Sequence, residues 1–177
     1  MIFAETEIKG AFIIELELRK DERGFFARTW CEREFEEHGL VSNIAQSNLS
    51  FSKKAGTLRG MHYQVAPFEE TKLIRCTKGA IYDVIIDLRT NSLTYKKWVA
   101  VELTEDNYKM LYVPKGFAHG FQTLKENTEV GYHVSQFYSP ECERGVRWDD
   151  ACFNIKWPEA EERIISKKDQ MWPDYKK

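Results

Sequence analysis

Cysteine is scarce in this sequence, and the few cysteines present are not paired. Cys31, Cys76, Cys142 and Cys152 are widely scattered, with no CxxC motif among them. Zinc ribbons and dithiol redox sites use closely spaced cysteines, so this spacing argues against both. Isolated thiols of this kind are typical of proteins in a reducing cytosol.

Long apolar runs and an excess of positive charge are also missing. No segment approaches the run of about 18 apolar residues that a membrane-spanning helix needs. Residues 1–7 lack the basic and apolar regions of a signal peptide. The formal net charge of −2 argues against nucleic-acid binding, which usually requires a basic excess. We therefore expect a cytoplasmic protein that binds neither membrane nor nucleic acid and meets any anionic ligand with a local cluster of Arg and Lys.

Linkers, low-complexity tracts and long internal repeats are absent as well. The chain has 177 residues, of which 42% are hydrophobic and 31% charged, an ordinary globular composition. A chain of this length buries roughly two-thirds of its unfolded surface. These properties predict a single domain over residues 1–177.

Short β-type runs separated by turn-forming clusters, such as Lys78-Gly79, recur along the chain. Evenly spaced short strands favour a sandwich or barrel over alternating βα units. We predict an all-β, antiparallel jelly roll with its ligand in the mouth between two sheets. The expected strands are Phe12–Leu18, Leu73–Cys76, Ala80–Leu88, Trp98–Leu103, Met110–Val113, Phe121–Leu124 and Val130–Phe137.

Two short peripheral helices are expected. Glutamates favour a helix over Glu32–His38, and Gly39 supplies a left-handed stop after it. A second helix is predicted over Ser166–Gln170, where Ser166 can cap the first turn.

The most informative stretch is Gly56–Gln64, followed by Lys72. It places a fixed cation (Arg59), a group that titrates near neutrality (His62) and an amine (Lys72) on two neighbouring strand-like segments. Histidine can take a proton at physiological pH, arginine can grip phosphate, and lysine can neutralise a developing oxyanion. The stretch therefore predicts an enzyme that moves protons beside a carbonyl in an anionic substrate.

Several motifs of this chain together match one family. The chain resembles the dTDP-4-dehydrorhamnose 3,5-epimerases, cupin-fold enzymes of activated deoxysugar synthesis. The resemblance runs nearly end to end, through Asp21–Phe26, Gln46–Asn48, Leu58–Gln64, Pro114–Phe121, Tyr138–Glu141, Glu143–Asp150 and Ile165–Asp169.

The resemblance implies a fold, an assembly and a reaction. The fold would be a cupin-type double-stranded β-helix, and the assembly a homodimer. The reaction would be epimerisation at C3 and C5 of a nucleotide-linked 4-keto-6-deoxyhexose, as in the conversion of dTDP-4-dehydro-6-deoxy-D-glucose to dTDP-4-dehydro-L-rhamnose. No cofactor would be needed, because the C4 ketone acidifies the hydrogens on both neighbouring carbons.

The resemblance also implies four catalytic residues. His62 would be the base, and Asp169 the carboxylate that orients and stabilises its imidazole. Lys72 would stabilise the enolate oxygen, and Tyr132 would donate the proton on the opposite face of the sugar. Without the family frame, His62 reads as a hydrogen-bonded strand histidine, Lys72 and Asp169 as solvated charges, and Tyr132 as a packed aromatic side chain.

Further residues match substrate contacts of the family. Tyr138 would stack on the base, its even offset from Tyr132 keeping both on one face of an extended strand. His119, after a Pro-x-Gly turn, would contact the substrate, and Asp83 is either a supporting carboxylate or an outward-facing residue. The expected contacts with the nucleotide or diphosphate are Arg23, Gln46, Asn48, Arg59, Glu143 and Lys168.

A metal site is not expected. Metal-binding cupins use two histidines separated by one residue, whereas this chain reads His62-Tyr63-Gln64. His62 and His119 alone would make a poor transition-metal site, so a metal-dependent dioxygenase is disfavoured.

Arg28 departs from the family pattern, which usually has a base-reading glutamate at this position. A guanidinium cannot accept the N3 hydrogen of thymine, but it can donate to acceptors on cytosine or guanine. One hypothesis is therefore a CDP- or GDP-linked substrate that Arg28 reads. The alternative is that Arg28 turns outward or pairs with an acid, and thymine is bound by stacking and backbone.

Three other functions stay open. The enzyme could epimerise only C3 or only C5. A 3,4-ketoisomerase would not obviously require Lys72, Tyr132 and the His62–Asp169 pair together. A non-catalytic nucleotide-sugar binding module would be expected to have lost these proton-transfer residues.

Overall fold

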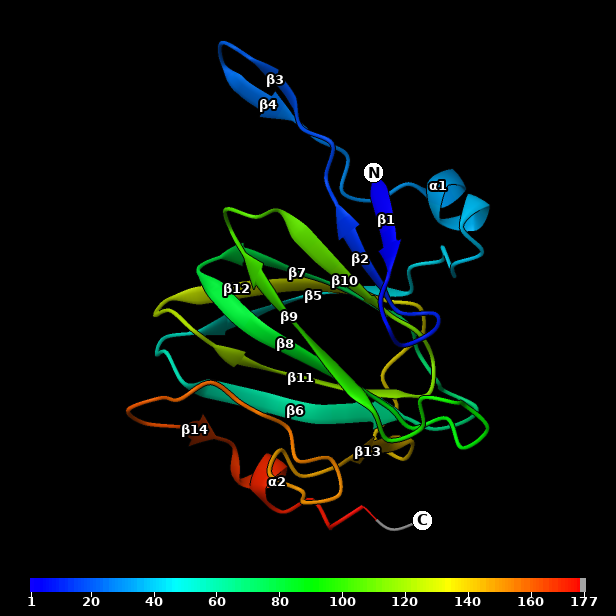
Figure 1. The fold of residues 1–177 in the computed structure, drawn as a ribbon, viewed down its shortest axis with the longest axis vertical. Helices are drawn as coiled ribbons and strands as arrows, with labels where there is room; N and C mark the ends of the chain where they lie inside the picture. Colours follow the sequence, from blue (N-terminus) through cyan, green and yellow to red (C-terminus); the bar gives the residue numbers. More distant parts are fainter. Residues whose placement is uncertain (176–177) are drawn as a thin grey trace.

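Two six-stranded, mainly antiparallel sheets, facing each other, form the body of the protein (Figure 1). The computed structural model describes residues 1–175. In spatial order the first sheet consists of β1 (Ile2–Glu5), β2 (Phe12–Glu15), β10 (Lys109–Val113), β7 (Lys72–Lys78), β12 (Thr128–Val134) and β5 (Gln46–Ser52).

The second sheet has the order β13 (Glu143–Gly145), β6 (Thr57–Gln64), β11 (Phe117–Thr123), β8 (Ala80–Asp87) and β9 (Trp98–Thr104). A short strand, β14 (Ile164–Ile165), runs parallel to β6. From β5 to β8 and again from β9 to β13, consecutive strands alternate between the two sheets, as in a jelly roll. The predicted all-β fold is confirmed.

An apolar cluster fills the space between the two sheets. Ile74 and Cys76 of β7 meet Ile81 and Ile85 of β8, and all four side chains are fully buried. Alternate residues of a strand point to opposite faces, so each strand contributes every second side chain to this layer. Tyr132 packs against the cluster, and the core therefore supports the inner surface on which the site is built.

Both predicted helices are confirmed. Helix α1 spans Glu32–Glu37, and Gly39 follows it with a φ of +70°, the left-handed conformation that ends a helix. Helix α2 spans Lys167–Gln170, and the Ser166 hydroxyl accepts a hydrogen bond from the Asp169 backbone N–H at 3.1 Å. Helix α2 lies beside β6, at the opposite end of the molecule from α1 (Figure 1).

The expected strands did not include β1, β5, β13 or β14, and three other assignments need correction. The run over Phe12–Leu18 is strand only to Glu15, and the run over Val130–Phe137 ends at Val134. Tyr138 therefore lies in a loop after β12, and the expectation that it shares a strand face with Tyr132 is wrong. His119 lies within β11 rather than in a turn.

A third sheet is a small hairpin that the sequence pattern did not predict. Strands β3 (Arg19–Asp21) and β4 (Gly24–Phe26) pair only with each other. The hairpin projects from the body beyond the N-terminus (Figure 1), and every residue of both strands is exposed. The ring of Phe25 packs edge-on against Tyr108, with the two ring centroids 4.9 Å apart.

Two further predictions concern the chain as a whole. All four cysteines are free thiols in the described chain, as expected from their spacing. Among residues 1–175, no helix has the length and apolar character needed to cross a bilayer.

Candidate active site

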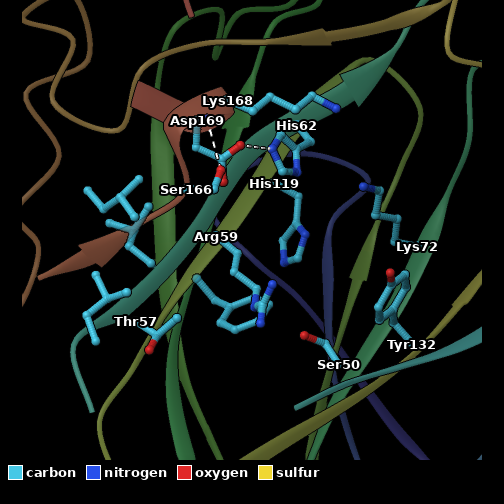
Figure 2. A pocket seen from close by; sticks show the side chains of 14 residues that line it. Ser50, Thr57, Arg59, His62, Lys72, His119, Tyr132, Ser166, Lys168 and Asp169 are labelled. Atoms are coloured by element: carbon cyan, nitrogen blue, oxygen red, sulfur yellow. Dashed lines mark hydrogen bonds and ion pairs between the residues drawn. The ribbon is translucent and has the colours of Figure 1, made fainter. Parts of the chain in front are cut away.

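A cavity of about 500 Å³ opens between the two sheets and receives side chains from both of them. His62, Arg59 and His119 come from the second sheet, whereas Lys72 and Tyr132 come from the first (Figure 2). The strands β6 and β7, expected to be neighbours, thus belong to opposite sheets, and their polar side chains face each other across the cavity. The fold therefore brings the predicted cation, imidazole and amine to one cavity, from opposing sheets.

A second cavity of about 410 Å³ adjoins the first and shares His62, Lys72 and Tyr132 with it. Its other lining residues include four of the predicted substrate contacts: Gln46, Asn48, Tyr138 and Glu143. The first cavity is lined by Arg59, His119, Lys168 and Asp169. The proton-transfer candidates thus lie where the two hollows meet.

His62 and Asp169 form a short side-chain contact in the site. The Nε2 atom of His62 lies 2.6 Å from Oδ1 of Asp169, although 107 residues separate them in sequence. The other carboxylate oxygen accepts a hydrogen bond from the Gly60 backbone N–H at 3.3 Å. The carboxylate thus fixes the ring plane of His62 and leaves Nδ1 free to face the cavity.

The charge on Asp169 is held by these contacts. Burial alone would raise its pKa, but hydrogen bonding and charge interaction with His62, together with the Gly60 and Ser166 contacts, lower the pKa below its usual value. Asp169 therefore stays ionised near neutral pH. An ionised partner favours the imidazolium form that a base acquires when it takes a proton.

Tyr132 and Lys72 lie close together on the opposite wall (Figure 2). Burial and the nearby charge of Glu70 raise the pKa of the Tyr132 phenol, so that it remains protonated at neutral pH. The ammonium of Lys72 pairs with Glu70 at 3.2 Å, and both side chains are largely buried. This wall thus presents a proton donor beside a fixed positive charge.

His119 is buried at the base of the first cavity and is paired with His62 across β11 and β6. Its Nε2 atom lies 2.6 Å from Oδ1 of Asp83, a fully buried residue of β8. The expectation of Asp83 as a supporting carboxylate is confirmed, and the outward-facing alternative is wrong. The site thus contains two separate histidine–aspartate pairs.

Gly60 sets the spacing of the two strands that carry these histidines. It has a φ of +122°, and a Cβ there would lie 2.5 Å from the Gly120 Cα and 2.8 Å from the His119 carbonyl oxygen. Only glycine permits this close backbone approach. The Leu-Arg-Gly-x-His frame therefore has a local structural reason, which is the packing of β6 directly against β11.

Arg59 projects from β6 of the second sheet into the first cavity (Figure 2), and its guanidinium is held by β5 of the first sheet. Its guanidinium donates hydrogen bonds to the hydroxyl of Ser52 at 3.3 Å and to the Phe51 carbonyl at 3.1 Å. These bonds leave further N–H groups of the fork to meet an anion. The position is consistent with the predicted phosphate contact.

Tyr138, Glu143 and Lys168 join around one carboxylate oxygen. Oε2 of Glu143 accepts hydrogen bonds from the Tyr138 hydroxyl at 2.8 Å and the Lys168 ammonium at 2.5 Å. Burial would raise the pKa of Glu143, but these two bonds outweigh it and lower the pKa. Three predicted contacts from distant segments thus form one rim of the site.

Arg23 and Arg28 are the predicted site residues that the fold of this chain does not bring to the cavities. Arg23 is on the projecting hairpin, 84% exposed, and pairs with Asp21 at 2.6 Å. Arg28 follows the hairpin, is half-exposed and lies 3.6 Å from Glu34 of α1. Within a single chain neither side chain lines a cavity of the site, and their contact with the substrate stays a prediction.

Gln64 and Glu70 are among the lining residues that the sequence reasoning missed. Each lies two positions from an assigned residue, Gln64 after His62 and Glu70 before Lys72, and residues two apart on an extended segment share a face. That periodicity could have found both. Within residues 1–175, no group of three or more His, Cys, Asp or Glu side chains is arranged to hold a metal ion.

Comparison with known proteins fits this geometry. The family model for dTDP-4-dehydrorhamnose 3,5-epimerase matches residues 5–177. The chain belongs to the dTDP-4-dehydrorhamnose 3,5-epimerase family. Members of this family are isomerases, so the predicted enzyme class is confirmed.

Individual relatives agree with the family assignment. The dTDP-4-dehydrorhamnose 3,5-epimerase of Sinorhizobium fredii is 42% identical over 98% of this chain and 89% of its own. The crystal structure of the Bacillus anthracis epimerase, with TDP and pyrophosphate bound, is 44% identical and has a TM-score of 0.93, covering 97% of this chain and 98% of its own.

A more distant epimerase structure has a narrower activity. It is ChmJ, a 3'-monoepimerase from Streptomyces bikiniensis in complex with dTDP-quinovose, which is 29% identical to this chain with a TM-score of 0.88. The match covers 95% of this chain and 85% of that one. The same fold thus accommodates single-centre epimerisation in that protein.

Proposed function

We propose that this protein epimerises C3 and C5 of dTDP-4-dehydro-6-deoxy-D-glucose and releases dTDP-4-dehydro-L-rhamnose. The observation that carries the proposal is the placement of His62 and Tyr132 on opposite walls of one cavity, with Lys72 beside the tyrosine. Inversion of a carbon needs a base on one face of the sugar ring and an acid on the other. The two walls supply both.

Each inversion proceeds through an enolate. His62 removes the proton from the carbon beside the ketone, and the electron pair moves onto the C4 oxygen. The Lys72 ammonium stabilises the oxyanion that forms there. Tyr132 then donates its proton to the same carbon from the opposite face, and the ketone is restored.

The charges around the cavity suit this division of roles. The lowered pKa of Asp169 keeps a negative charge against His62, which favours proton uptake by the imidazole. The raised pKa of Tyr132 keeps its phenol protonated, so it can act as the acid. No redox change or group transfer occurs, and therefore the reaction itself requires no cofactor.

Incubation of the 4-keto-6-deoxyhexose nucleotide in deuterated water tests the proposal. We expect solvent deuterium at both C3 and C5, with inversion at both centres, read by NMR and mass spectrometry. Deuterium at a single carbon would instead identify a single-centre epimerase like ChmJ. Binding without any exchange would identify a nucleotide-sugar binding module and contradict the proposal.

The nucleotide is proposed to be dTDP. The contact between Arg28 and Glu34 supports the alternative in which this arginine pairs with an acid and does not read the base. We expect calorimetric titration to give tighter binding of dTDP than of CDP or GDP. Equal or tighter binding of CDP or GDP would restore base reading by Arg28.

A homodimer is proposed as the working assembly. The hairpin residues Phe25 and Phe26 are 43% and 62% exposed, and Leu49 and Phe51 of the edge strand β5 are 67% and 44% exposed. Apolar groups of this size favour burial against a second subunit. A hairpin that reaches across to the partner would bring Arg23 and Arg28 to the partner's cavity, where they can meet the diphosphate or base.

A further inference from the structure

Gln64 sits at the far end of β6, two residues beyond His62, and its side chain is 5% exposed. It contributes no acid, base or charge to the reaction. Yet its carboxamide makes more contacts than any assigned site residue near it, with bonds to backbone atoms of two different loops. Both loops border the second cavity.

The carboxamide grips the two peptide groups that flank Tyr138. Its Oε1 accepts a hydrogen bond from the Ser139 N–H at 2.6 Å, and its Nε2 donates to the Phe137 carbonyl at 3.1 Å. Because each peptide group is planar, holding both fixes the two backbone torsions of the residue between them. Gln64 thus determines the direction in which the Tyr138 side chain leaves the backbone.

A second glutamine reinforces the same segment. Oε1 of Gln46 accepts a hydrogen bond from the Tyr138 N–H at 3.0 Å. The Tyr138 ring itself is 56% exposed at the rim of the cavity, so packing does little to hold it. Backbone bonds and the contact of its hydroxyl with Glu143 therefore set its position.

The nitrogen of the same carboxamide also holds the turn that precedes β7. Nε2 of Gln64 also donates to the Phe68 carbonyl at 2.8 Å and approaches Oε2 of Glu70 at 3.4 Å. This turn leads directly into β7 and Lys72. A carboxamide can accept at its oxygen while donating twice at its nitrogen, whereas a neutral imidazole has a single N–H. A histidine at position 64 could not make this set of bonds.

We propose that Gln64 is a positioning residue that holds Tyr138 in register with His62, so that the nucleotide base and the reacting sugar are bound at the correct separation. The inference rests on the proposed function and on the predicted stacking of Tyr138 on the base. It assigns Gln64 to nucleotide affinity and not to proton transfer.

Replacement of Gln64 with Met tests the role, because Met is similar in size and removes every one of these bonds. Loss of one aromatic contact to a base is expected to weaken dTDP binding by about tenfold. We expect the KM for the nucleotide sugar to rise by a similar factor, while kcat at saturation changes by less than about threefold. Unchanged dTDP affinity in a folded variant would overturn the proposal.

A double-mutant cycle separates positioning from a general structural effect. If Gln64 acts through Tyr138, the variant carrying both Gln64→Met and Tyr138→Ala should bind dTDP no more weakly than Tyr138→Ala alone. Multiplied losses in the double variant would show that Gln64 does not act through Tyr138. Should Gln64→Met fail to fold, the shorter carboxamide in Gln64→Asn is measured in the same cycle.

Gln122 provides the matched control. It is 1% exposed on β11, donates to the Pro158 carbonyl at 3.1 Å and accepts from Arg163 at 3.0 Å, and it lines neither cavity of the site. Gln122→Met should lower thermal stability without changing dTDP affinity, and an equal loss of affinity would overturn the proposal. The binding test needs no turnover. If the wild-type enzyme binds dTDP but exchanges no deuterium into the nucleotide sugar, the epimerisation is refuted, and the role of Gln64 in dTDP affinity can still be measured.

Discussion

The imidazole of His62 and the carboxylate of Asp169 lie 2.6 Å apart, joined across 107 residues by the docking of α2 against β6. The ring has a second nitrogen available to the cavity, and the carboxylate is almost completely buried. Asp169, in the C-terminal segment, thus both orients the ring of His62 and places a negative charge beside it. The pair is the first target for mutagenesis.

Asp169→Asn should lower kcat by about 10²- to 10⁴-fold, because the amide keeps the shape of the carboxylate but loses the charge that stabilises the imidazolium. The measurement is the rate of deuterium wash-in at C3 and C5 under saturating substrate, together with dTDP affinity by calorimetry. Affinity should change little. A variant with wild-type wash-in would show that the carboxylate does not support the base.

Tyr132→Phe should reduce net inversion by about 10²-fold or more, while initial proton removal by His62 declines less. The substitution removes only the hydroxyl of the phenol, whose raised pKa keeps it protonated. Exchange without inversion is the expected signature, since the enolate would be reprotonated from the face it was deprotonated on. Equal losses of exchange and inversion would remove Tyr132 from the role of separate acid.

Mixing two inactive variants tests whether the hairpin serves a partner's cavity. His62→Ala lacks the base, and Arg23→Ala lacks the exposed hairpin cation. In a mixed dimer one of the two sites would contain an intact base and an intact hairpin. Subunit exchange of equal amounts should therefore restore about a quarter of the wild-type activity. If the activity of the mixture does not exceed that of the separate variants, Arg23 does not act across a dimer. Light scattering would then report whether a dimer forms at all.

Asp87 offers a test of stability away from the site. Burial alone would raise its pKa, but hydrogen bonds from Arg89, Ser92 and Thr94 outweigh burial and lower the pKa from 3.8 to about 2. Because the pKa of Asp87 is lower in the folded chain than in the unfolded chain, its charge stabilises the fold at pH values above the unfolded pKa. This contribution is lost as the pH falls through about 2. Its size at neutral pH is about 2 kcal/mol.

Asp87→Asn should therefore lose about 2 kcal/mol of unfolding free energy at pH 7. In urea titrations the difference in unfolding free energy between the wild type and the variant should narrow as the pH is lowered from about 4 toward 2. Activity should be retained, since Asp87 lines neither cavity. A gap that is independent of pH would mean that the hydrogen-bond geometry, and not the charge, is what stabilises this loop.

Local features of the fold could be predicted from the sequence because their causes are local. Gly39 ends α1 through its own positive φ, and Ser166 caps α2 through a bond three residues away. The β-type runs likewise gave β2 and β7 to β12, since alternation and turn residues act within a few positions. Strands with weak alternation were missed or misjudged at their ends, as in the hairpin β3–β4 and the early end of β12 at Val134.

The residue types of the site, and the family to which they belong, were determined by the sequence alone, through His62, Lys72, Tyr132 and Asp169 in their motifs. Only the tertiary structure decided that β6 and β7 lie in opposing sheets, that Asp83 supports His119, that Gln64 holds the Tyr138 loop, and that the hairpin of Arg23 points away from its own cavity. The physical reason is that alternation along a strand fixes which residues share a face. Which other face they meet depends on how distant strands pair and on how the two sheets close on their common apolar core.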